Sequence, residues 1–147
     1  MDRFLIVTND GKDTDHSVTA KVKSLLTEAG KTCILCQKDE KKNIIRESIP
    51  EDLDCAVVIG GDGSLIEVAR LLWKRDVPVL GINMGTVGYL TEVEVSHIDQ
   101  AIRQIAAGDY EVEDRMMLEG SFEGQKEVVA LNDIVVCRKG ELRVIHF

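Results

Sequence analysis

The sequence has few basic residues relative to acidic ones and lacks any long apolar run. Its 147 residues include 18 lysines and arginines against 26 aspartates and glutamates, a formal net charge of -8. This balance argues against a nucleic-acid or anionic-membrane partner, because such binding depends on clustered Lys and Arg. The longest apolar runs, such as residues 4–7 and 56–59, are far shorter than the roughly 20 residues that cross a bilayer. With no signal-peptide pattern at the N-terminus, we expect a cytoplasmic protein without a membrane partner.

Cysteine and histidine are also scarce, and their placement does not support a redox or metal site. The four cysteines are Cys33, Cys36, Cys55 and Cys137. Cytoplasmic cysteines are expected to be reduced, and the C-x-x-C pair lies in a predicted strand, where residues three apart face opposite sides, so structural thiols are favoured. The histidines have no carboxylate or cysteine at ligand spacing, so neither histidine nor cysteine is predicted to ligate a metal. They are His16, His97 and His146.

The composition that remains, 44% hydrophobic and 30% charged, is typical of a folded globular chain. Short apolar runs predict strands at residues 4–8, 32–37, 55–59 and 79–82. Helical periodicity predicts helices at residues 18–29, 64–73 and 98–106, the last opened by a capping box of Ser96 and Asp99. This alternation predicts an α/β fold, a parallel sheet with helices on both faces. The mixed-charge run at residues 38–42 indicates a solvated loop.

Beyond about Glu113 the sequence shows no helical period. Short strand-like pieces occur at residues 116–122, 128–131, 134–137 and 144–147, with glycines between them. We therefore predict an α/β domain at residues 1–112 and the start of a β-rich second domain at residues 113–147. Because the chain ends inside the last of these pieces, we expect the second, all-β domain to be incomplete and the chain to be truncated.

The strongest local motif is Gly60-Gly61-Asp62-Gly63-Ser64, which lies between a predicted buried strand and a predicted helix. In a parallel sheet such a turn lies at the carboxyl edge, where ligands of open α/β folds bind. Glycines there allow backbone amides to approach an anion, and the following helix N-terminus adds partial positive charge. A tight turn with an aspartate as helix cap explains the same spacing, so both interpretations stay open at this point.

The residue types in this loop narrow its chemistry. It lacks the lysine of the Gly-Lys-Ser nucleotide loop. Asp62 is therefore the only strongly reactive group that the loop offers. A carboxylate beside a phosphate-binding turn predicts a general base, or a metal ligand, for phosphoryl transfer to a hydroxyl group.

Motifs in the right order resemble the NAD kinase family and cover nearly the whole chain. Residues 60–64 resemble the Gly-Gly-Asp-Gly-Thr motif that NAD kinases share with diacylglycerol-type lipid kinases and, in part, phosphofructokinases, with Ser64 in place of threonine. Residues 80–92 resemble specifically the NAD kinase stretch that follows the fourth strand. Residues 115–118 are similar to the family's entry into its second domain, and Leu131-Asn132-Asp133 to its dinucleotide-contact motif.

This resemblance implies a transferase with a Rossmann-like N-terminal domain that uses ATP to phosphorylate the adenosine ribose 2′-hydroxyl of NAD, giving NADP. Asp62 is implied as the catalytic residue that accepts or orients the 2′-hydroxyl proton. The implied nucleotide-binding residues are Gly61, Gly63, Ser64, Tyr89, Asn132, Asp133 and Arg143. Among these, the two glycines leave room for phosphates, and the Asn-Asp pair contacts the adenosine part. Because the glycine loop has no basic side chain, Mg²⁺ is expected to neutralise much of the triphosphate charge.

The resemblance also sets expectations for the whole protein. Tyr89 is expected either beside the nucleotide or packed on its own domain. The family completes its nucleotide site with a Gly-rich, Thr-containing segment that nothing here matches, so we expect the isolated chain to have little or no kinase activity. For the full-length enzyme the family implies homo-oligomers and NADP biosynthesis in the cytoplasm. Two alternatives stay open: a lipid or sugar-phosphate kinase that shares Asp62, and a non-catalytic nucleotide-sensing module.

Overall fold

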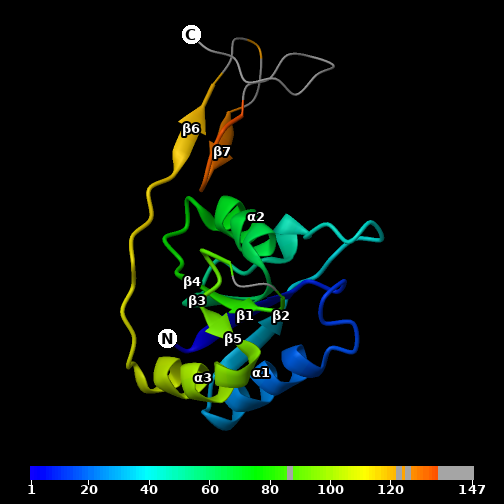
Figure 1. Cartoon of the computed structure of the whole chain (residues 1–147), viewed down its shortest axis with the longest axis vertical. Helices are drawn as coiled ribbons and strands as arrows, with labels where there is room; N and C mark the ends of the chain where they lie inside the picture. The colour runs from blue at the N-terminus through cyan, green and yellow to red at the C-terminus, as the bar shows by residue number, and fades with distance from the viewer. Residues whose placement is uncertain (86–87, 122–123, 125–126, 136–147) are drawn as a thin grey trace. The chain divides into compact units, whose positions relative to one another are not determined.

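The computed structural model describes residues 1–85, 88–121, 124 and 127–135. The chain divides into two compact units, Met1–Glu113 and Asp114–Phe147, and each is described by itself. The first unit contains a five-stranded sheet with its helices, and the second contains a two-stranded sheet (Figure 1). The domain boundary after residue 112 stays a prediction.

The sheet of the first unit is parallel throughout, with the strand order β2-β1-β3-β4-β5. The strands are β1 Arg3–Thr8, β2 Thr32–Leu35, β3 Cys55–Gly60, β4 Val79–Asn83 and β5 Val93–Glu94. The central strand, β3, is buried along its whole length, which explains its continuous apolar sequence, since a strand covered on both faces needs no polar side. The predicted α/β fold with a parallel sheet is confirmed.

Helices cover both faces of this sheet, as the periodicity predicts. The helices are α1 Ser17–Glu28, α2 Asp62–Leu72 and α3 Ile98–Ala107. Figure 1 shows α1 and α3 on one face and α2 on the other. Successive residues of β1 point to opposite faces of the sheet. Phe4 therefore packs in the core between the sheet and helices α1 and α3, whereas Leu5 packs in the core between the sheet and α2. Each face of the sheet therefore has its own apolar core.

The strand order reverses at β1, and this reversal locates the candidate site. The chain leaves β1 for its neighbour β2 and then returns to β3 on the other side of β1. Ligands of open α/β sheets bind at the carboxyl ends of the strands where the order reverses. At the reversal, the segments that leave this edge are residues 9–16, which follow β1, and Gly61, which follows β3.

Two local expectations about helix starts are wrong. The second helix begins at Asp62 rather than at Ser64, because the Gly61 carbonyl accepts from the N–H groups of Ser64 and Leu65 at 3.0 and 3.1 Å and so closes the first turn early. The capping box at Ser96 does not form. Ser96 lies inside a short 3-10 turn, η2 (Val95–His97), and its hydroxyl contacts Glu94 and the His97 ring instead of capping α3.

The cysteines of the first unit are packing residues. Cys33 packs against the core below α1 and α3, and Cys36 packs against the core below α2, so the expectation that they face opposite sides is confirmed. Cys55 is buried in β3, and burial raises the pKa of its thiol to about 12. All three are free thiols. Cys137 lies outside the described residues.

The second unit contains a short antiparallel pair of strands, β6 Leu118–Gly120 and β7 Val128–Ala130. These lie within two of the four predicted strand-like pieces. Residues 134 and 135 are not in a strand, and the pieces at residues 136–137 and 144–147 lie outside the described residues. Within the described part of the chain, no helix is long and apolar enough to cross a membrane.

Candidate functional site

Asn9 joins the two loops at the point where the strand order reverses. Its backbone N–H donates to the Ile59 carbonyl at 2.8 Å, and its side-chain amide donates to the Ser64 hydroxyl at 3.0 Å. Its side-chain oxygen accepts from the Gly11 N–H at 3.0 Å. A short side chain with both a donor and an acceptor can make these contacts at once. Asn9 thereby holds the loop after β1 against the end of β3 and the first turn of α2.

The Asp62 carboxylate holds the segment that follows β4. Its Oδ1 accepts from the Leu90 N–H at 3.2 Å, the Thr91 N–H at 3.1 Å and the Thr91 hydroxyl at 3.0 Å. Its Oδ2 accepts from the Tyr89 N–H at 2.8 Å. The carboxylate makes no capping bond to its own helix, so the interpretation of Asp62 as a cap of a tight turn is wrong. It instead ties the N-terminal end of α2 to residues 89–91.

These contacts also set the ionisation of Asp62. Partial burial raises the pKa of this carboxyl, but the hydrogen bonds from Tyr89, Leu90 and Thr91 outweigh that effect and hold the pKa below its ordinary value of 3.8. Hydrogen bonds to the charged form of a group favour that form. Asp62 is therefore ionised at neutral pH, in the acceptor-only form that can take a proton or a hydroxyl hydrogen bond.

Gly88 and Gly63 both lie near Asp62, but the packing requires a glycine at only one of the two positions. A Cβ at Gly88 would lie 2.1 Å from Oδ1 and 2.7 Å from Oδ2 of Asp62, so only glycine allows this close approach. A Cβ at Gly63 would meet no other atom within 4 Å. The packing of the chain thus explains glycine at position 88, whereas the space beside Gly63 is open.

Lys12, on the loop after β1, places a positive charge beside the glycine loop. A Cβ at Gly61 would lie 2.6 Å from the Lys12 Nζ, and a Cβ at Gly85 would lie 3.2 Å from it. The glycine loop itself has no basic side chain, as its sequence shows, but the Lys12 ammonium lies beside it. The cation comes from a different loop, 49 positions before Gly61 in the chain, so no pattern within the glycine loop indicates it.

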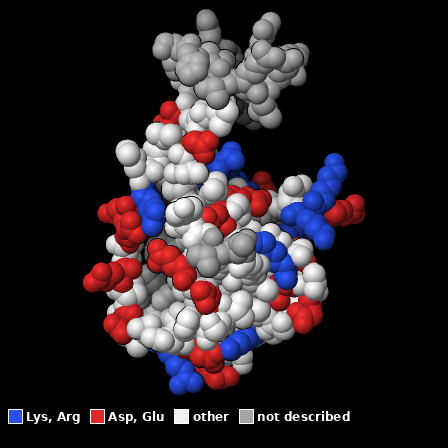
Figure 2. All heavy atoms as spheres, in the orientation of Figure 1, with Lys and Arg blue, Asp and Glu red and all other residues white. Residues whose placement is uncertain are grey.

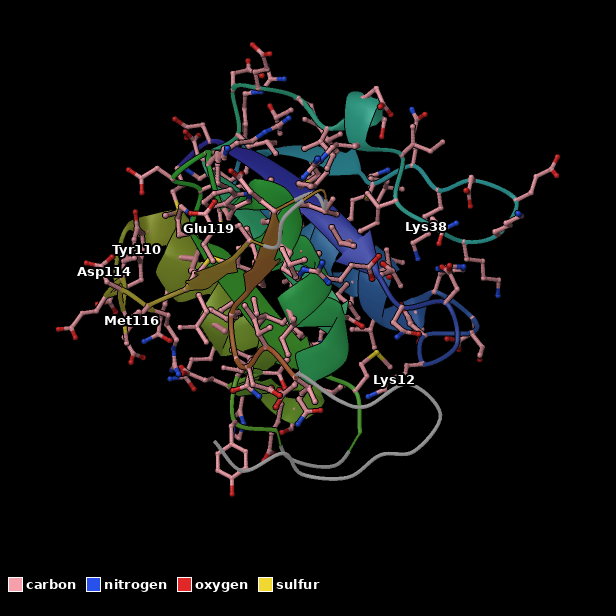
Figure 3. The ribbon with its side chains drawn as sticks, turned by 90° about the horizontal axis from the view of Figure 1, so that it is seen from above. Lys12, Lys38, Tyr110, Asp114, Met116 and Glu119 are labelled. Atoms are coloured by element: carbon pink, nitrogen blue, oxygen red, sulfur yellow. The ribbon has the colours of Figure 1, made fainter. Side chains whose placement is uncertain are left out.

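Lys38 is a second cation at the carboxyl edge that the sequence analysis missed. Its ammonium donates to the Thr8 carbonyl at the end of β1 and pairs with Asp10 at 2.8 Å. Figure 3 shows Lys12 and Lys38 on the loops that follow β1 and β2. The interpretation of residues 38–42 as a solvated loop is wrong for Lys38, whose side chain is only 19% exposed. Its position at the start of a mixed-charge run gave no signal of this contact.

The other predicted site residues fall into three groups. Gly61, Gly63 and Ser64 lie with Asp62 at the carboxyl edge of the first unit, where the Ser64 hydroxyl accepts from Asn9. Tyr89 lies in the same unit with a side chain that is 93% exposed, so the alternative that it packs on its own domain is wrong. The remaining predicted residues are Asn132 and Asp133, which are exposed and follow β7 in the second unit, and Arg143, which lies outside the described residues.

The described residues do not form a metal site of their own. They contain no group of three or more His, Cys, Asp or Glu side chains placed to hold an ion. Asp62, the carboxylate of the glycine loop, already accepts four hydrogen bonds. What the edge offers a ligand is an ionised carboxylate, an ammonium group and open backbone at a glycine turn. This combination can bind a phosphorylated molecule and take a hydrogen bond from a hydroxyl group.

The family profile of the ATP-NAD kinase N-terminal domain matches residues 11–110 of this chain. Among curated proteins, the NAD kinase of Lachnospira eligens is 37% identical over an alignment that covers 100% of this chain and 54% of that protein. The NAD kinase of Lachnoclostridium phytofermentans is 35% identical over an alignment that covers 99% of this chain and 54% of that protein. The chain thus spans about half the length of the curated relatives that it matches.

Two solved structures share the fold. One is an NAD kinase from Archaeoglobus fulgidus in complex with ATP, with a TM-score of 0.56 and 22% sequence identity, and the match covers 80% of this chain and 39% of that one. The other is a yeast NADH kinase complexed with NADH, with a TM-score of 0.68 and 14% identity, and the match covers 88% of this chain and 46% of that one. At these identities the likeness bears on the fold alone.

Proposed function

The chain belongs to the NAD kinase family, and we propose that it supplies the catalytic aspartate and part of the nucleotide site for phosphorylation of NAD by ATP. The product is NADP, phosphorylated at the adenosine ribose 2′-hydroxyl. The observation that carries this proposal is the position of Asp62: an ionised carboxylate on the glycine loop, at the sheet edge where the strand order reverses. The two solved proteins of the same fold bind ATP and NADH, and the family membership of this chain supports nucleotides as its own small-molecule ligands.

Asp62 is the group that we assign to the 2′-hydroxyl. Oδ1 already accepts three hydrogen bonds, whereas Oδ2 accepts one, from the Tyr89 N–H. Of the two oxygens, Oδ2 has the fewer donors, and an ionised carboxylate oxygen with a single donor can accept another. Oδ2 can therefore accept the 2′-hydroxyl without releasing residues 89–91, and it orients that oxygen for attack on the γ-phosphorus of ATP. The hydroxyl oxygen forms the new bond to phosphorus, ADP leaves, and the proton passes to the carboxylate.

The remaining predicted residues have binding roles in this proposal. Gly61, Gly63 and Ser64 line the turn that phosphates approach, and the open space beside Gly63 supports this role. Tyr89, with its exposed ring, is available to contact the nucleotide. From the second unit, Asn132 and Asp133 would hydrogen-bond the adenosine part, and Arg143 would be a further substrate contact.

We assign Mg²⁺ to the ATP rather than to a site built by the chain. Mg²⁺ usually binds through one or two carboxylates together with substrate phosphates, and the described residues do not offer a cluster that would hold it alone. When bound, the ion neutralises phosphate charge. A homo-oligomeric assembly and a cytoplasmic location also belong to the proposal, on the family resemblance alone.

The relatives are about twice as long as the match, and we propose that full activity requires the part of their length that this chain does not match. The test measures NADP formed from NAD, ATP and Mg²⁺ by two proteins. One is this chain. The other is this chain fused to the part of the Lachnospira eligens NAD kinase that follows the aligned region. Circular dichroism and thermal melting establish that each protein is folded.

We expect NADP from the fused protein and little or none from the chain alone. Each protein is also assayed with the Asp62→Asn substitution, which should abolish NADP formation, and with diacylglycerol and a sugar phosphate as acceptors. Phosphorylation of a lipid or sugar phosphate but not of NAD would contradict the proposal in favour of another kinase. Binding of ATP and NAD by a folded fused protein that transfers no phosphate would contradict it in favour of a nucleotide-sensing module.

A further inference from the structure

We propose that Lys12 is a phosphate-binding residue, whose ammonium group holds a phosphate of a bound nucleotide over the glycine loop. The motifs that identify the family do not include this residue, since it lies on the loop after β1. The identity of the ligand as a nucleotide rests on the proposed function. Both ATP and NAD carry phosphates, so the shared chemistry is a nucleotide phosphate, and the experiment separates the two.

The first observation is where the ammonium lies. The Lys12 Nζ occupies the space that a Cβ would need at Gly61, and it lies near the corresponding space at Gly85. These glycines follow neighbouring strands, β3 and β4, at the same edge of the sheet. The ammonium therefore lies over two backbone segments that have no side chain there, which is where a phosphate would also contact backbone amides.

The second observation is that the loop is held so that Lys12 points there. The Asn9 carbonyl accepts from the backbone N–H of Lys12 at 2.9 Å and from that of Asp13 at 3.0 Å. The buried Asp13 carboxylate in turn accepts from the N–H groups of Val18 and Thr19 at 3.2 and 2.8 Å. Lys12 thus lies between two anchored residues, and less loop freedom is lost when its ammonium binds a ligand.

The third observation is that the neighbouring carboxylates are already paired. Asp10 pairs with Lys38, Asp13 accepts from the first turn of α1, and Asp62 accepts from residues 89–91. Figure 2 shows acidic and basic side chains interspersed over one face. Where both signs are mixed, a lysine is available to a ligand only if no neighbouring carboxylate already pairs with it. Within the part of the chain that the structure describes, the Lys12 ammonium has no hydrogen bond or ion pair.

The test measures the affinity of this chain for tripolyphosphate, ATP and NAD by isothermal titration calorimetry at one fixed salt concentration. The variants are Lys12→Met, Lys12→Arg and the control Lys23→Met, which removes another exposed charge, from α1. Hydrogen bonds from a charged donor contribute enough that we expect Lys12→Met to raise Kd about tenfold or more. Lys12→Arg should retain most of the affinity, and Lys23→Met should change it by less than about twofold.

The pattern across ligands identifies the phosphate. A loss confined to tripolyphosphate and ATP assigns Lys12 to the phosphoryl donor, and a loss confined to NAD assigns it to the diphosphate of the acceptor. Either result supports the proposal. Equal affinities of the wild-type chain and Lys12→Met for every ligand would overturn it, as would a folded wild-type chain that binds none of the three.

A double-mutant cycle separates contact by Lys12 from a general effect of charge. Gly61→Ala places a methyl group where the ammonium lies and displaces it without removing the charge. If Lys12 holds the phosphate, Gly61→Ala should weaken binding more in the wild-type chain than in the Lys12→Met background, where its methyl group acts only by crowding the turn that phosphates approach. Equal effects in both backgrounds would contradict the proposal. The proposed function can fail separately, because loss of phosphate affinity in Lys12→Met would stand even if no protein form produced NADP.

Discussion

Asp62 and Thr91 are joined by two hydrogen bonds, from the Thr91 N–H at 3.1 Å and the Thr91 hydroxyl at 3.0 Å, although they lie 29 positions apart in the chain. Thr91 is buried, and Asp62 begins α2. The pair therefore connects the N-terminal end of α2 to the segment that leads from β4 to β5. This contact positions the Asp62 carboxylate, the group that we assign to the 2′-hydroxyl of the substrate.

Asp62→Asn should loosen this segment and remove the proposed catalytic group. An asparagine side chain has one acceptor oxygen, and its NH₂ group would face one of the four donors that now point at the carboxylate. We expect faster amide hydrogen exchange at residues 89–91 and a loss of about 100-fold or more in NADP formation by the fused protein. Asp76→Asn, at an exposed position, is the control and should leave both unchanged. Unaltered exchange in Asp62→Asn would contradict the structural part of this account.

The hydrogen bonds to Asp62 should be visible as a local pH dependence. The pKa of this carboxyl is below 3.8 in the folded chain. The stabilisation of residues 89–91 by the carboxylate is therefore complete above pH 3.8 and is lost as the pH falls through the lower, folded-state value. A ¹³C titration of the Asp62 carboxyl should give a pKa below 3.8, and amide exchange at residues 89–91 should accelerate in the same range. A pKa above 3.8 would contradict the assigned contacts.

Alanine at the two glycines near Asp62 should have opposite effects on stability. Gly88→Ala places a methyl group against the Asp62 carboxylate and should lower the free energy of unfolding by about 1–3 kcal/mol. Gly63→Ala meets no atom and lies in the first turn of α2, so it should raise that free energy by up to about 1 kcal/mol. Urea denaturation measures both. Under the proposed function, Gly63→Ala should still weaken binding of ATP, because its methyl group enters the space left for phosphate.

Asp13→Ala should destabilise the start of α1. The Asp13 carboxylate is buried and accepts from the N–H groups of Val18 and Thr19 and from the Thr19 hydroxyl. Leaving these donors without a partner should cost about 2 kcal/mol in unfolding free energy. Asp15→Ala removes an exposed carboxylate from the same helix end and should cost less. Equal melting temperatures for the two variants would contradict the assignment of the Asp13 carboxylate as the acceptor for the first turn of α1.

The periodicity of the sequence was sufficient to predict the layers of the fold. Buried parallel strands such as β3 are continuous apolar runs, and α3 repeats its apolar residues at helical spacing, so both appear in the sequence itself. β5 has only two residues and forms because the edge of β4 is available to it, so no local pattern indicates it. The predicted start of α2 is too late because glycine has a low helix propensity, so residues 60–63 give no helical signal. In the structure the Gly61 carbonyl accepts the hydrogen bonds that close the first turn.

The candidate site was predictable only in part. The glycine loop and Asp62 are contiguous in sequence and have a recognisable pattern. The partners of Asp62 lie 27 to 29 residues later, and Lys12 and Lys38 reach the same edge from two other loops, so their roles depend on the strand order. Three lysines near positions 38–42 look alike in sequence, and only the structure distinguishes the one that bonds to β1.

The most direct test of the central claim is an NMR titration of the ¹⁵N-labelled chain, first with ATP and then with NAD. The account predicts that the largest amide shift changes occur at residues 9–13, 60–64 and 88–91, the three segments that meet at the carboxyl edge of the sheet. It also predicts that Asp62→Asn reduces the changes at residues 88–91. Largest changes at the opposite edge of the sheet, or none in these three segments with either nucleotide, would contradict the account.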